Sequence, residues 1–273
     1  MRAWVNGQLL DGATGCALSV TDHGFTVGDG VFESIKTLDG VPFALTRHLE
    51  RLAVSASGLG LPAPDEAEVR RGVAEVLKGT DDVLGRLRIT YTAGPAPMGS
   101  GRGGGPATLV VAYSAIRKLS LTTAVATVPW PRNERGATAG LKTTSYAENV
   151  IALARASELG ASEAIFANTA GNLCEGTGSN VFYVVDGELR TPTLRSGCLA
   201  GVTRALVLEW YGGVEVDEAM SVIERASEAF LVSTTRDVQA ISKWDERDLP
   251  APGPITRDCW RTWIQREAAH LDP

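Results

Sequence analysis

This sequence of 273 residues contains four segments that predict short turns, each between two apolar stretches. Asn6-Gly7, Asp39-Gly40 and Asp186-Gly187 are dipeptides that favour tight hairpin turns, because both residues of such a turn need positive φ angles. A fourth turn is expected at 168–171, within "EAIFANTAGNLCEG". Strands joined as hairpins build antiparallel sheets, whereas parallel sheets need βαβ units. With helices between the hairpins, the sequence predicts an α+β fold.

The helices and loops between these hairpins suggest two domains. "LTRHLERLAVSASG" places apolar residues near one helical face and ends at Gly58, and "EAEVRRGVAEVLKG" predicts a second helix. We predict a small α/β domain over residues 1–115, a linker over 116–120 and a larger domain over 121–273. In the larger domain, Thr144 or Ser145 is expected to cap the helix "AENVIALARASEL".

Charge and cysteine content disfavour several classes of protein. A net charge of −6 and a pI near 5.2 disfavour nucleic acid or an anionic membrane as partner, and no apolar run reaches about 18 residues. The three histidines and four cysteines are scattered and form no CxxC pair, so neither a metal site nor a disulfide framework is expected. Because the N-terminus has no signal-peptide pattern, we expect a cytoplasmic protein.

Lys142, in "GLKTTSYAENV", is one of only five lysines among 26 basic residues. A cation near a helix N-terminus is mildly disfavoured by the helix dipole, and the neighbours of this lysine are hydroxyl residues rather than acids. Lysine, unlike arginine, can lose its proton and attack a carbonyl group to form a Schiff base. A lone lysine is most often a solvated one, but these surroundings make Lys142 a candidate nucleophile.

Three further sites contain residue types that suit such chemistry. Glu175 lies between an apolar pair and the turn-forming "GTGSN", and a buried carboxylate there would keep a pyridine ring protonated as an electron sink. Val202 and Thr203 begin a helix, where free amides suit a phosphate. Thr234 and Thr235 belong to the hydroxyl cluster "STTR" at the end of a strand. With the lysine, these are the parts of a pyridoxal 5'-phosphate (PLP) site.

Six motifs occur in an order and spacing that is similar to one known family. They are "DHGFTVGDGVFESIK", "RHLERL", "GLKTTSYAENV", "CEGTGSNVFYVVDGELRTP", "GCLAGVTR" and "VSTTRDVQAI". Over nearly its whole length the chain resembles the class IV aminotransferases, which are PLP enzymes of fold type IV. That family includes branched-chain and D-amino acid aminotransferases and 4-amino-4-deoxychorismate lyases.

The resemblance implies a role for each matching residue. Lys142 matches the lysine that holds the cofactor, and Glu175 matches the partner of the pyridine nitrogen. Arg51, which by itself could form an ordinary surface salt bridge, matches a phosphate-binding arginine. The remaining phosphate contacts of the family match Val202, Thr203, Thr234 and Thr235. The resemblance also implies a small α/β domain, a larger pseudo-barrel domain with the cofactor between them, and a homodimer.

The candidate substrate residues come from the same comparison. Branched-chain enzymes carry a tyrosine five residues after the lysine, whereas here Tyr146 lies one position earlier. D-amino acid aminotransferases and the lyases have an arginine where this chain has Ala93. Arg88 aligns with an arginine of the branched-chain enzymes, and we take it, with Phe32 and Tyr146, as the substrate residues.

Strand alternation supports this choice of arginine. Arg88, Thr90 and Thr92 share one face of the predicted strand "RITYTAG" and could form a polar wall for a substrate carboxylate. Arg102 is the other candidate, but it lies among glycines, and we expect it to be mobile.

The function predicted from these residues is amino transfer from an amino acid to a 2-oxo acid, with PLP as cofactor. One alternative is 4-amino-4-deoxychorismate lyase, which uses the same apparatus to expel pyruvate and form 4-aminobenzoate for folate synthesis. The other is a PLP-binding protein of the same fold without catalytic activity, which the presence of both Lys142 and Glu175 disfavours. A 2-oxo acid acceptor is needed by the transferase but not by the lyase.

Overall fold

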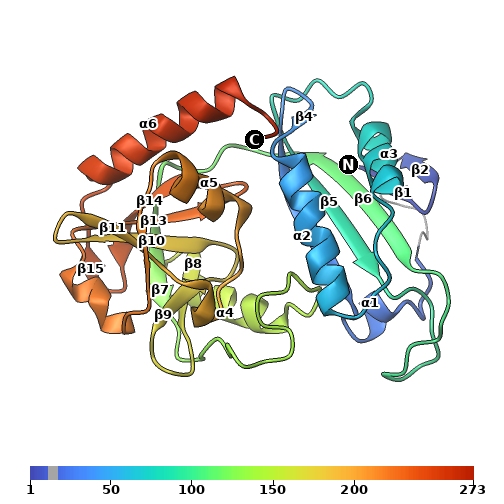
Figure 1. The fold of residues 1–273 in the computed structure, drawn as a ribbon, viewed down its shortest axis with the longest axis horizontal. Helices are drawn as coiled ribbons and strands as arrows, with labels where there is room; N and C mark the ends of the chain where they lie inside the picture. Colours follow the sequence, from blue (N-terminus) through green and yellow to red (C-terminus); the bar gives the residue numbers. More distant parts are fainter. Residues whose placement is uncertain (12–17) are drawn as a thin grey trace. The chain divides into compact units, whose positions relative to one another are not determined.

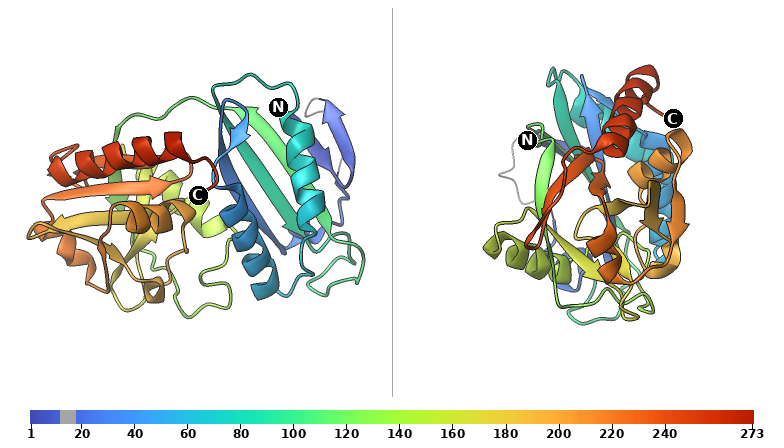
Figure 2. Two further views of the ribbon diagram at one scale, coloured as in Figure 1. Left: turned by 45° about the horizontal axis from the view of Figure 1, so that its top comes forward. Right: turned by 90° about the vertical axis from the view of Figure 1, so that its left-hand side faces the viewer.

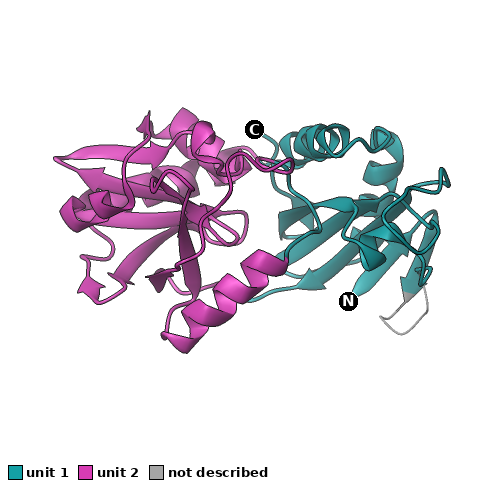
Figure 3. Cartoon of the chain, turned by 90° about the horizontal axis from the view of Figure 1, so that it is seen from below, with its two compact units in different colours: residues 1–118, 141–146, 271–273 teal, residues 119–140, 147–270 magenta. Residues whose placement is uncertain are grey.

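The chain forms two compact units in the computed structural model, which describes residues 1–11 and 18–273 (Figure 3). Unit 1 comprises Met1–Lys118, Leu141–Tyr146 and Leu271–Pro273, and unit 2 comprises Leu119–Gly140 and Ala147–His270. Cys16, one of the scattered cysteines, lies outside the described residues. The segment that carries Lys142 belongs to unit 1, whereas the expected domain bounds included it in 121–273.

Unit 1 is an antiparallel sheet with two helices against one face (Figure 1). Its strands run in the order β2-β1-β6-β5-β3-β4. Its elements are β1 (Arg2–Val5), β2 (Gln8–Asp11), α1 (His23–Thr26), β3 (Gly30–Leu38), β4 (Val41–Pro42), α2 (Leu45–Gly58), α3 (Glu66–Leu77), β5 (Leu84–Thr92) and β6 (Thr108–Ala115). The core between the sheet and α2 and α3 includes Trp4, Ile35, Leu52 and Val73.

Strand alternation places several polar residues, together with Phe32, on the other face of this sheet. Along β5, Leu87 and Ile89 are fully buried in the core, whereas Arg86 and Arg88 are exposed. Ser34 of β3 is paired with Arg88 in the antiparallel ladder, so their side chains share this face. The predicted polar wall therefore exists in part, because Arg88 Nε donates to Thr90 Oγ1 at 3.4 Å.

Unit 2 contains a sheet that curls and is covered by helices (Figure 2). The strand order is β12-β11-β10-β13-β14-β7-β8-β9, with β15 paired to β14. Its elements are β7 (Thr122–Thr127), α4 (Ala147–Glu158), β8 (Glu163–Ala167), β9 (Leu173–Gly176), β10 (Asn180–Val185), β11 (Glu188–Pro192), η1 (Leu194–Ser196), α5 (Val202–Trp210), β12 (Val214–Val216), η2 (Met220–Arg225), β13 (Glu228–Ser233), β14 (Asp237–Trp244), β15 (Arg247–Asp248) and α6 (Pro254–Ala269). β9 ends the order yet contacts β10 and β11, which gives the predicted pseudo-barrel its curl.

The hairpins predicted from Asx-Gly dipeptides are confirmed. Asn6, Asp39 and Asp186 have φ angles of 44°, 48° and 53°, and the glycine that follows each of them also has a positive φ angle. Each dipeptide joins an antiparallel pair, β1–β2, β3–β4 and β10–β11. Among the described residues, no helix is both long and apolar enough to cross a membrane.

The predicted cap of α4 is wrong. The helix begins at Ala147, and the hydroxyl groups of Thr144 and Ser145 donate instead to the carbonyl oxygen of Gly28, at 2.9 and 3.1 Å. The same carbonyl oxygen also accepts from Gly30 N at 3.0 Å, so the two hydroxyls add to a main-chain contact just before β3.

Candidate active site

The backbone around Lys142 is held like a short extra strand beside β3 of unit 1. Phe32 N donates to Lys142 O at 3.0 Å, and Thr144 N donates to Gly30 O at 2.8 Å. Lys142 N donates to the buried Ser55 hydroxyl of α2 at 3.2 Å. These contacts link the lysine to a strand and a helix that are both far from it in sequence, so its backbone position depends on the fold of unit 1.

The side chain of Lys142 shares an aromatic ring with Arg88. Lys142 Nζ lies 4.4 Å from the centroid of the Phe32 ring, and the Arg88 guanidinium carbon lies 3.4 Å from the same centroid. Tyr146 meets Phe32 edge to face, with ring centroids 5.4 Å apart. Although the residue as a whole is exposed, packing of its guanidinium against the ring partly desolvates that group and lowers the pKa of Arg88 to about 10, so it stays charged at neutral pH. Lys142 and the three candidate substrate residues that the sequence proposed therefore lie together in unit 1.

Arg51 is bound to a buried carboxylate that the sequence analysis did not single out. Its Nε and Nη2 donate to Glu33 at 2.8 and 2.7 Å, and Nδ1 of His48 lies 2.7 Å from the same carboxylate. The guanidinium of Arg51 outweighs desolvation and holds the pKa of Glu33 at about 2. Burial lowers the pKa of His48, so a neutral imidazole donates to the ionised Glu33. A phosphate contact by Arg51 would thus use the opposite edge of its guanidinium.

Glu33→Gln is expected to destabilise the protein by about 3–5 kcal/mol, because it leaves the largely buried Arg51 guanidinium without its counter-charge. The pKa of Glu33 is lowered on folding, from 4.5 to about 2, so its contribution is present above pH 4.5 and is lost as the pH falls toward 2. Chemical denaturation between pH 2 and 4.5 should show that the unfolding free energy changes less with pH in the variant than in the wild type.

The matched control is Glu66→Gln, which removes an exposed carboxylate that pairs with Arg70 on the same unit. Such exposed pairs contribute about 0–1 kcal/mol. If Glu33→Gln and Glu66→Gln have the same unfolding free energy, the pair of Glu33 with Arg51 does not stabilise the protein as predicted.

Arg102 is anchored, and the prediction that it is mobile is wrong. Its Nε and Nη2 donate to Asp29 at 2.7 and 2.6 Å, and its guanidinium also donates to the carbonyl oxygens of Leu59 and Gly60, both at 2.7 Å. This pairing lowers the pKa of Asp29. The glycines around Arg102 allow the loop many backbone conformations, but four hydrogen bonds from the Arg102 side chain hold it in one of them.

Glu175, in β9 of unit 2, lies in a buried and charge-compensated environment. Its Oε2 accepts from Leu199 N at 2.9 Å, and its Oε1 lies 3.2 Å from Nε of Arg132. The Arg132 guanidinium also lies 4.2 Å over the ring of Phe166, the residue paired with Glu175 across the β8–β9 ladder. A carboxylate held in this way is the type of group that could bind a protonated ring nitrogen.

The two predicted phosphate segments both lie in unit 2. Val202 and Thr203 form the first turn of α5, which has Gly201 as its N-cap and no capping side chain. The first amides of a helix have no partner within it, so this turn offers donors to an anion. Thr234 and Thr235 lie in the turn after β13, which is closed by Arg236 N donating to Ser233 O at 3.1 Å.

The loop before α5 is tied directly to Glu175 and Asn180. The Asn180 side chain donates to Leu199 O at 2.9 Å, while Leu199 N donates to Glu175. A Cβ at Gly201 would come within 2.0 Å of Asn180 Oδ1, so glycine allows this close approach. Unit 2 therefore brings Glu175 close to the loop that leads into α5.

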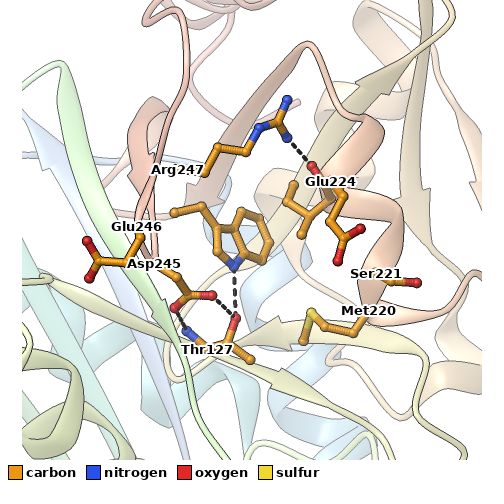
Figure 4. A pocket seen from close by; sticks show the side chains of 9 residues that line it. Thr127, Met220, Ser221, Glu224, Asp245, Glu246 and Arg247 are labelled. Carbon is orange, nitrogen blue, oxygen red and sulfur yellow. Dashed lines mark hydrogen bonds between the residues drawn. The ribbon is translucent and has the colours of Figure 1, made fainter.

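A groove of about 590 Å³ in unit 2 is lined by other residues (Figure 4). Trp244 Nε1 donates to Thr127 Oγ1 at 2.9 Å, and Asp245 accepts from both the amide and the hydroxyl group of Thr127. Arg247 donates to the carbonyl oxygens of Ile223 and Ala226. The polar groups named here pair with one another, and no residue of the candidate site lines the groove.

Comparison with known proteins settles the family. Residues 30–244 match the model of the amino-transferase class IV family. The chain belongs to this family. The resemblance seen in the sequence is thus confirmed, and so is the prediction of an aminotransferase enzyme, since this class IV protein has relatives named for that activity.

Three similar proteins illustrate the range of the family. A D-alanine aminotransferase of Bacillus licheniformis is 30% identical, and the match covers 94% of each chain. A branched-chain aminotransferase structure from Thermoproteus uzoniensis with norvaline is 29% identical, with a TM-score of 0.89 over 97% of this chain and 94% of that one. A fold IV-transaminase from Curtobacterium pusillum is 32% identical, with a TM-score of 0.84 over 96% and 93%.

Sequence reasoning missed two supporting residues at this site. Arg132, ten positions before Lys142, carries no local signal, since its neighbours in "WPRN" resemble an ordinary loop. Glu33 follows an apolar pair in "GVFESIK", and a charge inside such a strand is a signal that could have been used.

Proposed function

We propose that this protein is a PLP-dependent amino acid aminotransferase in which Lys142 holds the cofactor and moves protons at the substrate. Class IV aminotransferases use PLP in general, and the amino donor and 2-oxo acid of the reaction follow from that family. Bound PLP supplies an electron sink that accepts the electron pair released when the substrate loses its α-proton.

The observation that carries this proposal is the grouping around Phe32. An amine and a guanidinium, from Lys142 and Arg88, both lie over one aromatic ring. An amino acid substrate needs a base at its α-carbon and a cation for its carboxylate, and these two side chains supply one of each. Once deprotonated, the Lys142 amine serves as nucleophile and base, whereas the Arg88 guanidinium remains charged.

Unit 2 contains residues suited to the phosphate and the pyridine nitrogen of PLP. The first turn of α5 has no side-chain cap, so its amides suit a phosphate. Glu175 is paired with Arg132 and is suited to a protonated pyridine nitrogen. In our proposal Val202, Thr203, Thr234 and Thr235 bind the phosphate, with Arg51 as a further cation, while Phe32, Arg88 and Tyr146 contact the substrate.

A coupled assay tests the function. Purified protein with added PLP is incubated with single L- or D-amino acids and a 2-oxo acid, and the new amino acid is identified by chiral chromatography. Turnover that requires the acceptor supports amino transfer. Pyruvate formed from 4-amino-4-deoxychorismate without any acceptor identifies the lyase. PLP binding without turnover on any donor identifies a non-catalytic protein, and no PLP binding rejects the proposal.

We also propose that the protein is a cytoplasmic homodimer, as the family resemblance implies. Helix α4 exposes the apolar side chains of Val150 and Ile151, which are 63% and 56% exposed in the single chain. Cys174, Cys198 and Cys259 are free and buried, which is compatible with a reducing compartment. Light scattering during size-exclusion chromatography measures the mass in solution and distinguishes a dimer from a monomer.

A further inference from the structure

Glu163, the first residue of β8, is a buried carboxylate without a role in the function proposed above. It is 2% exposed, and its carboxylate is surrounded by donors from separate segments of unit 2. Oε1 accepts from the amide and the hydroxyl group of Thr177, and Oε2 accepts from the Ser179 hydroxyl at 2.9 Å. The hydroxyl groups of "GTGSN" therefore point at Glu163, although the sequence suggested only a turn.

The same carboxylate binds the turn after β13. Arg236 Nη2 lies 3.4 Å from Glu163 Oε2 and also donates to Ser162 O at 3.1 Å. Nη1 of Arg236 donates to the side chain of Gln239, whose Nε2 donates to Ser120 O at 2.6 Å. Arg236 is thus held by three partners, and it ends the turn that contains Thr234 and Thr235.

Gly176 permits the approach between the carboxylate and the loop after β9. A Cβ at this glycine would come within 2.4 Å of Ser179 Oγ and 3.1 Å of Glu163 Cδ. The loop is closed by Gly176 N donating to Ser179 O at 2.8 Å and is held from α4 by Asn149, which donates to Thr177 O at 2.9 Å. The conformation of this loop therefore depends on its contacts with the Glu163 carboxylate.

Glu163 thus joins one segment that adjoins residues assigned to the cofactor by the proposed function to another that contains such residues. One is the loop 176–180, which directly follows Glu175 and, through Asn180, holds the start of α5. The other is the turn 233–236, joined through Arg236. A buried ion pair adds little net stability by comparison with apolar residues, but a fully bonded network fixes the geometry of the groups around it.

We propose that Glu163 is a positioning residue that, through Arg236 and the Thr177 and Ser179 hydroxyls, sets the turn 233–236 relative to the start of α5 so that both contact one phosphate. The inference rests on the proposed function. It predicts that Glu163 affects binding of the phosphate group and not binding of the pyridine ring.

The test compares PLP with pyridoxal, which lacks the phosphate. The dissociation constant of each is measured by absorbance titration of the apoenzyme for the wild type and for Glu163→Gln, which keeps the side-chain size and removes the charge. We expect the affinity for PLP to fall about ten- to a hundredfold, by analogy with the loss that follows when the outer partner of a metal ligand is removed. The affinity for pyridoxal should change about threefold or less, because no phosphate contact is involved.

Two further variants make the result interpretable. Glu218→Gln is the matched control, since Glu218 also accepts from a hydroxyl and an arginine in unit 2, those of Tyr183 and Arg190, and it should leave both affinities unchanged. Arg236→Lys keeps the positive charge, and so favours folding, but lacks the planar fork that serves three partners. Like Glu163→Gln, it should weaken the binding of PLP more than the binding of pyridoxal.

The outcomes separate this inference from the proposed function. Equal loss of PLP and pyridoxal affinity in Glu163→Gln, or a PLP-to-pyridoxal ratio equal to that of the control, overturns the positioning role. If Glu163→Gln does not fold, an unchanged ratio in Arg236→Lys overturns it. A wild-type protein that binds neither compound rejects the proposed function itself.

Discussion

Lys142→Ala is expected to lower the rate of amino transfer about a thousandfold or more, because it removes both the nucleophile and the base. The variant should fold, since the main-chain contacts of the segment to β3 and to Ser55 do not involve the lysine side chain. Borohydride reduction followed by peptide mass spectrometry should find the cofactor attached at Lys142 in the wild type and no attachment in the variant.

Lys243→Ala is the control for this experiment. Lys243 is half exposed and pairs with the exposed Glu246, so its loss should change neither the rate nor the labelling. Reductive labelling of the Lys142→Ala variant at another lysine, with turnover retained, would show that the nucleophile has been misassigned.

Arg88→Leu is expected to raise KM for amino acid donors about ten- to a hundredfold, which corresponds to the loss of about 1.5–3 kcal/mol from a charge-assisted contact. The spectrum of the bound cofactor should be unchanged, because in our proposal Arg88 contacts the substrate. Simple amines without a carboxylate, where they react, should show little change in KM. Initial rates over a range of donor concentrations measure both effects.

Arg86→Leu provides the matched comparison. Arg86 lies two residues earlier on the same face of β5 and pairs with Lys36 in the ladder. The guanidinium of Arg88 lies over the Phe32 ring, 3.4 Å from its centroid. A similar rise in KM for both variants would indicate a general effect of surface charge. An equal loss for donors with and without a carboxylate would make Arg88 a structural residue.

Several features of this protein follow from local sequence alone. The three Asx-Gly turns were predictable because Asn, Asp and Gly tolerate the positive φ angles that tight hairpins need. Helix α2 ends at Gly58 as predicted. The family was also recognisable, because the spacing of six motifs along the chain does not depend on knowing which residues touch. Glu175 is buried, and the apolar pair just before it in the sequence was the signal that favoured a buried carboxylate there.

The tertiary structure alone decided which side chains are partners. Arg102 appeared mobile from its glycine neighbours, yet its carboxylate partner, Asp29, lies 73 residues away. The sequence assigned Arg51 to phosphate, but one edge of its guanidinium binds Glu33. Glu163 pairs with Arg236, which lies 73 positions later in the sequence. Backbone preferences act over a few residues, whereas a charge pairs with whatever the fold brings within about 4 Å. The turns were therefore predictable from the sequence, and these ion pairs were not.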